Sequence, residues 1–363
     1  MAASVIRRNA LGLALAALAA GCTTVEYYSQ AALGHLDVMQ RARPIDAVIA
    51  DPAAPATLKR RLERVQKMRE FAVSELGLPD NGAYRSYADL GRPYVVWNVF
   101  AAPALSVEPV QSCFPIAGCV SYRGYYAHAD ALAHAAELGA RGLDTYVGGV
   151  PAYSTLGWFD DPVLSTFIGY PDAEFARLLF HELAHQRVYV KDDTAFNESF
   201  ATAVELEGVD RWLAAHGTPE QRTAFERQQM RRQAFIALLL RYRERLREAY
   251  ARSAADDEKR AAKTRLLDEL RSEYAALKAD WGGYPGYDRF FAEGVNNANL
   301  ASIASYAELV PAFRALLARE DGNLPRFYLE VERLAALPRD QRHAALDRLA
   351  PRVAVKARTS RPG

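Results

Sequence analysis

Hydrophobic positions along the chain follow a helical period at first, then a strand-like pattern, then a helical period again. Between residues 58 and 72, apolar residues recur at three- and four-residue spacing, with charged residues on the other faces. This spacing predicts an amphipathic packing helix, and Gly77 with Pro79 predicts its end. We therefore expect a helical segment over residues 22–83.

Short β-branched and aromatic runs bounded by Pro and Gly dominate residues 84–170. Residues 94–100 and 145–150 predict two strands, and an Ala-rich stretch over residues 128–138 predicts a short helix between them. The sequence thus predicts a small sheet. Gly148 and Gly149 would let a substrate backbone approach an edge of this sheet, although the same glycines also suit a tight turn.

Helical spacing returns after Pro171 and continues almost to the end of the chain. Capping residues and apolar periodicity predict successive helices over residues 173–190, 194–216, 219–253, 256–281 and 309–317. The expected fold is α+β, with a small sheet over a central helix and mostly helical N- and C-terminal parts. We assign the core to residues 84–217, a flanking helical region to 218–352 and a frayed tail to 353–363.

Composition identifies a globular chain, because half of the residues are apolar and a quarter are charged. The formal net charge is only +1. Arginines crowd between residues 231 and 247, but glutamates interleave with them. We therefore expect no nucleic-acid partner.

The N-terminus has the polarity of a signal peptide over residues 1–21. Arg7 and Arg8 precede an Ala/Leu/Gly run that closes at Gly21 and Cys22 and is too short to span a bilayer as a mature helix. The closing residues resemble a bacterial lipobox, which implies cleavage before Cys22, a membrane anchor through its lipids and, with Thr23 next, an outer-membrane location facing the periplasm. An ordinary secretory signal that removes Cys22 is the alternative.

Export would determine the oxidation state of the two remaining cysteines, Cys113 and Cys119. An oxidising compartment favours a disulfide between them. A pair of zinc thiolates is the alternative, but a structural zinc site needs four ligands and no further cysteine is present.

The strongest chemical motif is His-Glu-x-x-His at residues 181–185, inside a predicted helix. On a helix, this spacing places His181 and His185 one turn apart on one face, as a catalytic zinc site requires. We expect Glu198, on the following helix, to be the third ligand. Glu205 lies about 10 Å further along that helix, so both cannot bind one ion; its alternative role is to support a ligand. Asp192 and Asp193 are weaker candidates that also suit helix capping.

Glu182 lies beside the histidines and is expected to act as the general base rather than as a ligand. The tetrahedral oxyanion of peptide hydrolysis also needs a hydrogen-bond donor. Tyr153, Tyr125 and Tyr306 are the candidates for this role among nineteen tyrosines.

The strings at residues 113–125, 146–162, 178–201 and 296–298 resemble a bacterial family of predicted zinc aminopeptidases. The resemblance extends from about residue 27 to about residue 337. It implies a gluzincin-like metallopeptidase with a zincin-like fold, exported as a lipoprotein and acting on peptides or proteins. It also implies one Zn²⁺ held by His181, His185 and Glu198, with Glu182 as base.

The chain departs from well-known zinc aminopeptidases in two respects. The interval from His185 to Glu198 is shorter, and the string Gly-x-Met-Glu-Asn, whose glutamate would bind a substrate amine, is absent. Endopeptidase action, hydrolysis of peptidoglycan amides and a non-catalytic zinc-binding scaffold therefore remain as alternatives.

Overall fold

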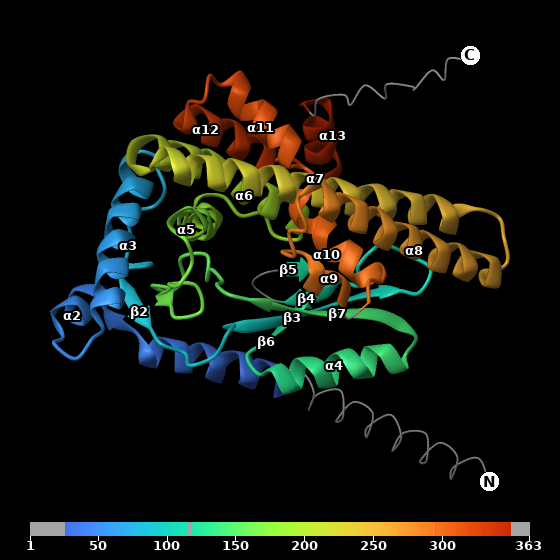
Figure 1. The fold of residues 1–363 in the computed structure, drawn as a ribbon, viewed down its shortest axis with the longest axis horizontal. Helices are drawn as coiled ribbons and strands as arrows, with labels where there is room; N and C mark the ends of the chain where they lie inside the picture. Colours follow the sequence, from blue (N-terminus) through green and yellow to red (C-terminus); the bar gives the residue numbers. More distant parts are fainter. Residues whose placement is uncertain (1–25, 115–117, 293, 350–363) are drawn as a thin grey trace, which may run out of the picture.

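The computed structural model describes residues 26–114, 118–292 and 294–349. The fold is α+β, as predicted, with small sheets surrounded by helices (Figure 1). The predicted signal peptide, Cys22 and the predicted tail over 353–363 lie outside the described residues. Among the described helices, none has both the length and the apolarity that a bilayer span requires.

The central sheet is antiparallel and contains both predicted strands. β3 (Val96–Pro103) lies between β6 (Arg123–Tyr125) and β7 (Leu143–Val150). A second small sheet joins β1 (Arg43–Pro44), β2 (Ser86–Ala88) and β8 (Val163–Leu164). A two-stranded hairpin, β4 (Ser112–Phe114) and β5 (Gly118–Val120), completes the strands.

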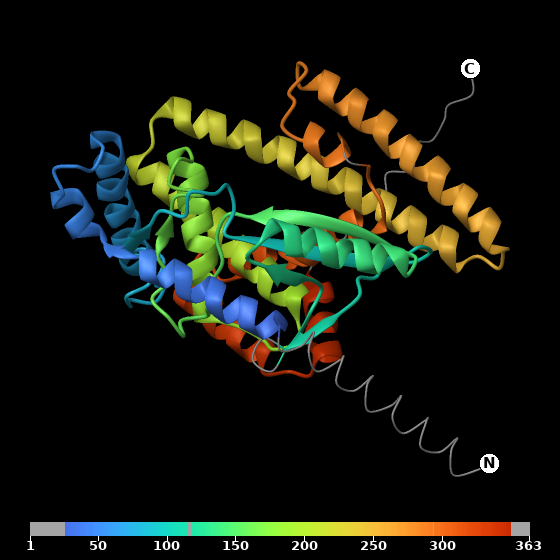
Figure 2. The same cartoon turned by 90° about the horizontal axis from the view of Figure 1, so that it is seen from below.

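Helices cover both faces of the central sheet. Successive side chains of a strand point to opposite faces, and apolar side chains of β3 pack against helices on both faces. Val99 and Ala101 pack in one cluster with residues of α4 (His128–Ala140). Phe100 and Ala102 pack on the other side against Ala298 of α10 (Asn297–Ala307). The sheet is therefore a buried middle layer (Figures 1 and 2).

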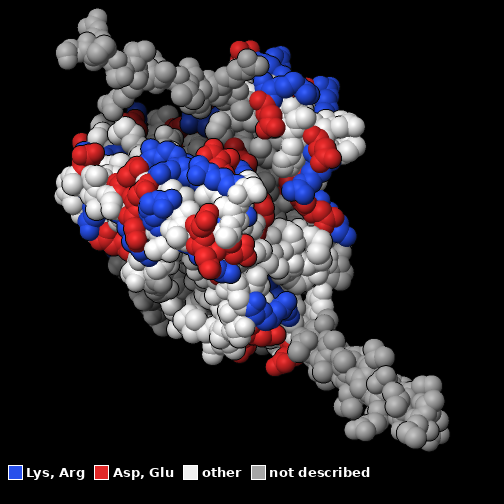
Figure 3. All heavy atoms as spheres, turned by 90° about the vertical axis from the view of Figure 1, so that its right-hand side faces the viewer, with Lys and Arg blue, Asp and Glu red and all other residues white. Residues whose placement is uncertain are grey.

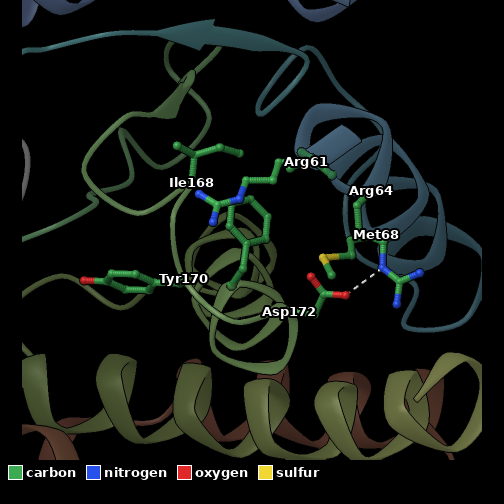
Figure 4. Close-up of a pocket in the computed structure, with 8 residues that line it drawn as sticks. Arg61, Arg64, Met68, Ile168, Tyr170 and Asp172 are labelled. Carbon is green, nitrogen blue, oxygen red and sulfur yellow. Dashed lines mark ion pairs between the residues drawn. The ribbon is translucent and has the colours of Figure 1, made fainter. Parts of the chain in front are cut away.

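The two helices that carry the candidate site are α5 (Asp172–Arg187) and α6 (Thr194–His216). They match the predicted helices, although α5 ends three residues before the predicted limit. α3 (Ala56–Ser74), close to its predicted position, holds the start of α5, since Arg64 pairs with Asp172 at 2.9 Å (Figure 4). The small pocket there, about 20 Å³, is lined by none of the candidate metal-binding residues.

The C-terminal helices share one hydrophobic core with α5 and α6. They are α11 (Val310–Arg319), α12 (Leu324–Ala335) and α13 (Arg339–Leu349). Phe200 of α6 is 6.0 Å, between ring centroids, from both Phe313 of α11 and Phe327 of α12. The helix that supplies the expected third ligand is thus fixed by residues more than 100 positions away.

The long helices α7 (Pro219–Ala251) and α8 (Asp256–Asp280) pack side by side and have a core of their own, to which α9 (Asp288–Ala292) contributes. Several of their arginines form ion pairs; Arg245, for example, lies 2.6 Å from Glu269. Figure 3 shows basic and acidic side chains interleaved on this side of the molecule.

The Asn-rich turn at residues 296–299 begins α10 and caps this helix. Asn296 Oδ1 accepts hydrogen bonds from the backbone N–H groups of Ala298 and Asn299. Asn297 is fully buried, and its Nδ2 donates to the carbonyl oxygens of Pro103 and Ala104. The cluster thereby fastens α10 to the end of β3.

Candidate metal centre

Helix α5 presents His181 and His185 on one face, with their ring centroids 4.8 Å apart. The faces around them are anchored in the core, because Leu179, Phe180 and Leu183 are fully buried. The two histidines retain 9% and 8% exposure. Packing therefore fixes the helix while the imidazoles keep limited contact with solvent.

Helix α6 brings Glu198 to the Nε2 atoms of both histidines. Glu198 Oε2 lies 3.2 Å from His181 Nε2 and 3.6 Å from His185 Nε2, and the two Nε2 atoms are 3.2 Å apart. Three ligands on one face of a tetrahedral zinc site are separated by about 3.3 Å when the bonds are about 2.0–2.1 Å. This buried group could therefore hold a metal ion.

Glu205 lies on the other side of the His181 ring. His181 Nδ1 donates to Glu205 Oε2 at 2.8 Å, and Arg177 Nη1 donates to Glu205 Oε1 at 2.9 Å. Arg177 is also paired with Glu174, at 3.0 Å. Glu205 thus orients the imidazole and leaves its Nε2 directed toward Glu198.

The charges of this cluster reinforce one another. Burial alone would lower the pKa of His181, but the Glu198 and Glu205 carboxylates raise it to about 10. Burial opposes ionisation of Glu198, yet the two histidines hold its pKa at about 2. Arg177 and His181 likewise outweigh burial and hold the pKa of Glu205 at about 2. Both glutamates are therefore anionic at neutral pH.

The start of α6 is fixed by Asp193. Its side chain accepts a hydrogen bond from Phe196 N–H, and from α13 Arg342 Nε and His343 Nε2 approach its Oδ2 at 2.9 and 2.8 Å. Asp192 instead accepts from Cys119 N–H at 2.5 Å. Asp193 thus caps a helix and Asp192 anchors a loop, so neither belongs to the candidate metal-binding group.

The predicted disulfide between Cys113 and Cys119 is present and joins β4 to β5. Through Cys119 N–H this hairpin contacts the turn between α5 and α6. Gly118, at φ +75°, lies so close to that turn that a β-carbon would fall 2.3 Å from Asp192 Oδ1. The hairpin therefore packs directly on the segment that leads to Glu198.

Glu182 lies one residue after the first histidine and is 8% exposed. Burial raises the pKa of its carboxyl group, and the negative charges of Glu198 and Glu205 act in the same direction, while the two histidines oppose them. A carboxyl group with a raised pKa is suited to accept and return a proton near neutral pH.

The three tyrosines singled out from the sequence are placed differently from one another. The Tyr153 hydroxyl is 2.7 Å from His35 Nδ1. Tyr125 belongs to the cluster beneath α4, with Ala131 and Ala135. Tyr306 lies in α10, but its side chain is outside the described residues. The role of oxyanion donor remains a prediction for Tyr153 and Tyr306, whereas Tyr125 packs on the sheet face opposite α10.

Two tyrosines that sequence reasoning missed are influenced by the charges of Glu182 and Glu198. Burial, and then the charge of Glu198, raises the pKa of Tyr122, and Glu182 adds to this effect. Burial, and then the charge of Glu182, raises the pKa of Tyr84. Tyr122 lies two residues after the disulfide hairpin, and that proximity is the signal that could have identified it.

Tyr84 is held in an unusual conformation. Its φ of 61° is uncommon for a bulky residue. Its backbone N–H donates to Asp161 O at 2.6 Å, and its buried hydroxyl has no hydrogen-bond partner among the described residues. Buried Arg69 secures the preceding loop by donating to the carbonyl oxygens of Pro79 and Ala83. The loop thus places an unpaired hydroxyl near Glu182.

The fold and these residues define an α+β protein with a candidate metal centre of two histidines and a glutamate. The chain belongs to the protein family described as "Putative aminopeptidase", whose family model matches residues 26–346. No curated protein and no solved structure is significantly similar to the chain. Family membership identifies a peptidase at a coarse level.

Proposed function

We propose that the protein is a zinc-dependent metallopeptidase, with aminopeptidase action as the form that family membership favours. The observation that carries the proposal is the triangle formed by His181 Nε2, His185 Nε2 and Glu198 Oε2, with sides of 3.2, 3.2 and 3.6 Å. These separations suit a tetrahedral ion bound by nitrogen and oxygen ligands. Two imidazoles and one carboxylate are also the donor set of known catalytic zinc sites.

Bound zinc would supply a Lewis acid for the scissile carbonyl and would lower the pKa of a water molecule. The protein's own residues would carry the proton transfers. Glu182 would take a proton from the attacking water and pass it to the leaving amine, for which a carboxyl group with a raised pKa is suited. Glu205 would keep His181 in the tautomer that leaves Nε2 free to bind the metal.

Tyr122 is our candidate for the donor that stabilises the oxyanion. Burial and the neighbouring Glu198 and Glu182 carboxylates raise its pKa, so its hydroxyl stays protonated and able to donate at neutral pH. No hydrogen bond within the described part of the chain occupies this hydroxyl. A donor fixed beside the reacting carbonyl would stabilise the charge that develops in the transition state.

The test combines metal analysis, turnover and product mapping. The purified protein should hold about one zinc ion, and Glu182→Gln should keep the metal while lowering kcat by roughly 10²–10⁴-fold, the range for general acid–base groups. Retained turnover in the variant would refute the mechanism. N-terminal sequencing of peptide products would distinguish stepwise removal of single residues from internal cleavage. A panel with muropeptides would reveal action on peptidoglycan amides.

We also propose that the mature protein is exported and anchored to the outer membrane through lipids on Cys22. The support is the sequence alone: the charged start, the short apolar run and the lipobox-like closure. Cys22→Ser should move the protein from the membrane fraction to the soluble periplasmic fraction. Unchanged fractionation would contradict lipidation.

A further inference from the structure

Large apolar side chains gather on one exposed surface, formed by the helix over residues 26–41 and the loop over residues 151–161. Ten large hydrophobic side chains are exposed among the described residues, and five of them lie in these two segments. We call these five the N-terminal apolar surface: Tyr28, Leu33, Leu36, Trp158 and Phe159, which are 41%, 66%, 49%, 70% and 53% exposed. Exposed apolar groupings of this kind mark interaction sites in folded proteins.

The helix and the loop that form this surface are in contact. The rings of His35 and Phe159 lie 4.6 Å apart, and His35 Nδ1 is 2.7 Å from the Tyr153 hydroxyl. Leu36 follows His35 directly. The N-terminal apolar surface is therefore assembled from two segments that are more than 100 residues apart in the sequence.

One face of the helix over residues 26–41 packs against the rest of the protein, and its exposed leucines face solvent. Gln30 accepts a hydrogen bond from Tyr126 N–H and donates to Gly124 O. Gly34 lies against the Tyr126 ring, where a β-carbon would fall 2.2 Å from Cγ. Figure 2 shows the helix, in blue, along the outside of the molecule.

Charge is sparse on this surface. Asp37 is the one charged residue between positions 27 and 40, and it is paired with Arg41 at 2.8 Å. Residues 151–159 contain no charged side chain, and the exposed Asp160 follows them. The surface is therefore suited to apolar contact rather than to electrostatic attraction by anionic groups.

The chain that precedes this helix indicates what the surface would face. Residue 26, the first described residue of this helix, follows Cys22 by four positions. Four extended residues span at most about 14 Å. Lipids on Cys22 would thus hold residue 26 within that distance of a bilayer, and Leu36 lies about 15 Å further along the same helix. Tryptophan and other aromatic side chains favour the boundary between headgroups and acyl chains.

We propose that the N-terminal apolar surface docks onto the lipid bilayer, with Trp158 and Phe159 at the level of the headgroups. The proposal rests on the proposed lipid anchor and is independent of the peptidase reaction. An anchor by itself limits distance but not orientation, whereas an apolar face that enters the interface selects one orientation. Gly157 of this loop lies against α5, where a β-carbon would fall 3.8 Å from Oε1 of Gln186, the residue after His185, so docking would hold the candidate metal centre on the bilayer side of the molecule.

The test separates docking from natural lipidation. The mature chain from Cys22 onward is coupled through its thiol to a maleimide-headgroup lipid in phosphatidylcholine vesicles; Cys113 and Cys119 are joined, so Cys22 is the free thiol. Some of the vesicle lipid carries bromine on its acyl chains, which quenches nearby tryptophan. We expect the bromine to quench tryptophan fluorescence in the wild type, and this quenching should persist at high salt. Trp158→Phe should abolish the quenching, because Trp158 is the one of the four tryptophans that lies on this surface.

Matched variants give the decisive comparison. The pair Leu33→Ser and Leu36→Ser should abolish quenching of Trp158, whereas Met230→Ser with Leu329→Ser, 64% and 54% exposed on α7 and α12, should leave it unchanged. Absent quenching in the coupled wild type would overturn the proposal. Quenching that survives Trp158→Phe would also overturn it. So would a dimer of the wild type that the two leucine substitutions dissociate, because the surface would then bind a second copy of the chain. An altered KM in Trp158→Phe without quenching would instead indicate a substrate surface.

Discussion

Replacement of Glu205 by glutamine is the sharpest test of the candidate metal centre. Glutamine keeps the size of the side chain and one acceptor oxygen, but it removes the charge that faces His181 Nδ1 at 2.8 Å and Arg177 at 2.9 Å. Alanine would be a poorer choice, because it would also remove the remaining acceptor oxygen and leave a cavity in the buried site. The glutamine variant should fold and still weaken the metal site.

The expected magnitude follows from the positions of the two glutamates. Groups that orient a metal ligand typically contribute 10–100-fold in affinity, or about 1.4–2.7 kcal/mol. Glu198→Gln should cost more than Glu205→Gln, because Glu198 Oε2 is itself one of the three converging donor atoms. Glu174→Gln is the matched control, since Glu174 also pairs with Arg177 but, within the described part of the chain, forms no ion pair with either histidine. Its zinc affinity should change least.

The assay is a competitive zinc titration against a chromophoric chelator, with thermal unfolding measured in parallel. Zinc binding to the native state should raise the unfolding temperature of each variant in the order of its affinity. The order wild type, Glu174→Gln, Glu205→Gln, Glu198→Gln would support the geometry. A larger loss for Glu205→Gln than for Glu198→Gln would refute Glu198 as the third ligand.

Two further outcomes are expected. Tyr122→Phe should lower kcat by roughly 10²–10³-fold without weakening zinc binding, as removal of an oxyanion donor does. Tyr125→Phe, on the opposite sheet face, should leave kcat unchanged. Equal losses of kcat in steady-state assays would remove Tyr122 from this role. Burial raises the pKa of Asp161 from 3.8 to about 7. Its contribution to folding is therefore full below about pH 4 and is lost as pH rises to about 7, by up to about 4 kcal/mol. Asp161→Asn should flatten this dependence in urea unfolding from pH 4 to 8, and an unchanged slope would contradict the assignment.

Much of the local structure could be predicted from the sequence, because it depends on neighbours along the chain. The helical spacing around His181 and His185 places both imidazoles on one face, whatever lies opposite them. Likewise, a cap precedes α6 at Asp193, and the pair Cys113 and Cys119 is close enough in sequence to bond across a short hairpin. These features need only the backbone period and the local chemistry of each residue.

The composition of the candidate site depended on the tertiary structure. Glu198 and Glu205 lie two turns apart on one helix face, and only the packing of α6 against α5 directs the first to Nε2 and the second to Nδ1 of His181. Tyr122 and Tyr125 are three residues apart, yet the strand alternation and the hairpin place the first near Glu198 and the second beneath α4. Sequence spacing fixes which face of an element a side chain occupies, but the partner of that face is chosen by contacts between segments far apart in the chain.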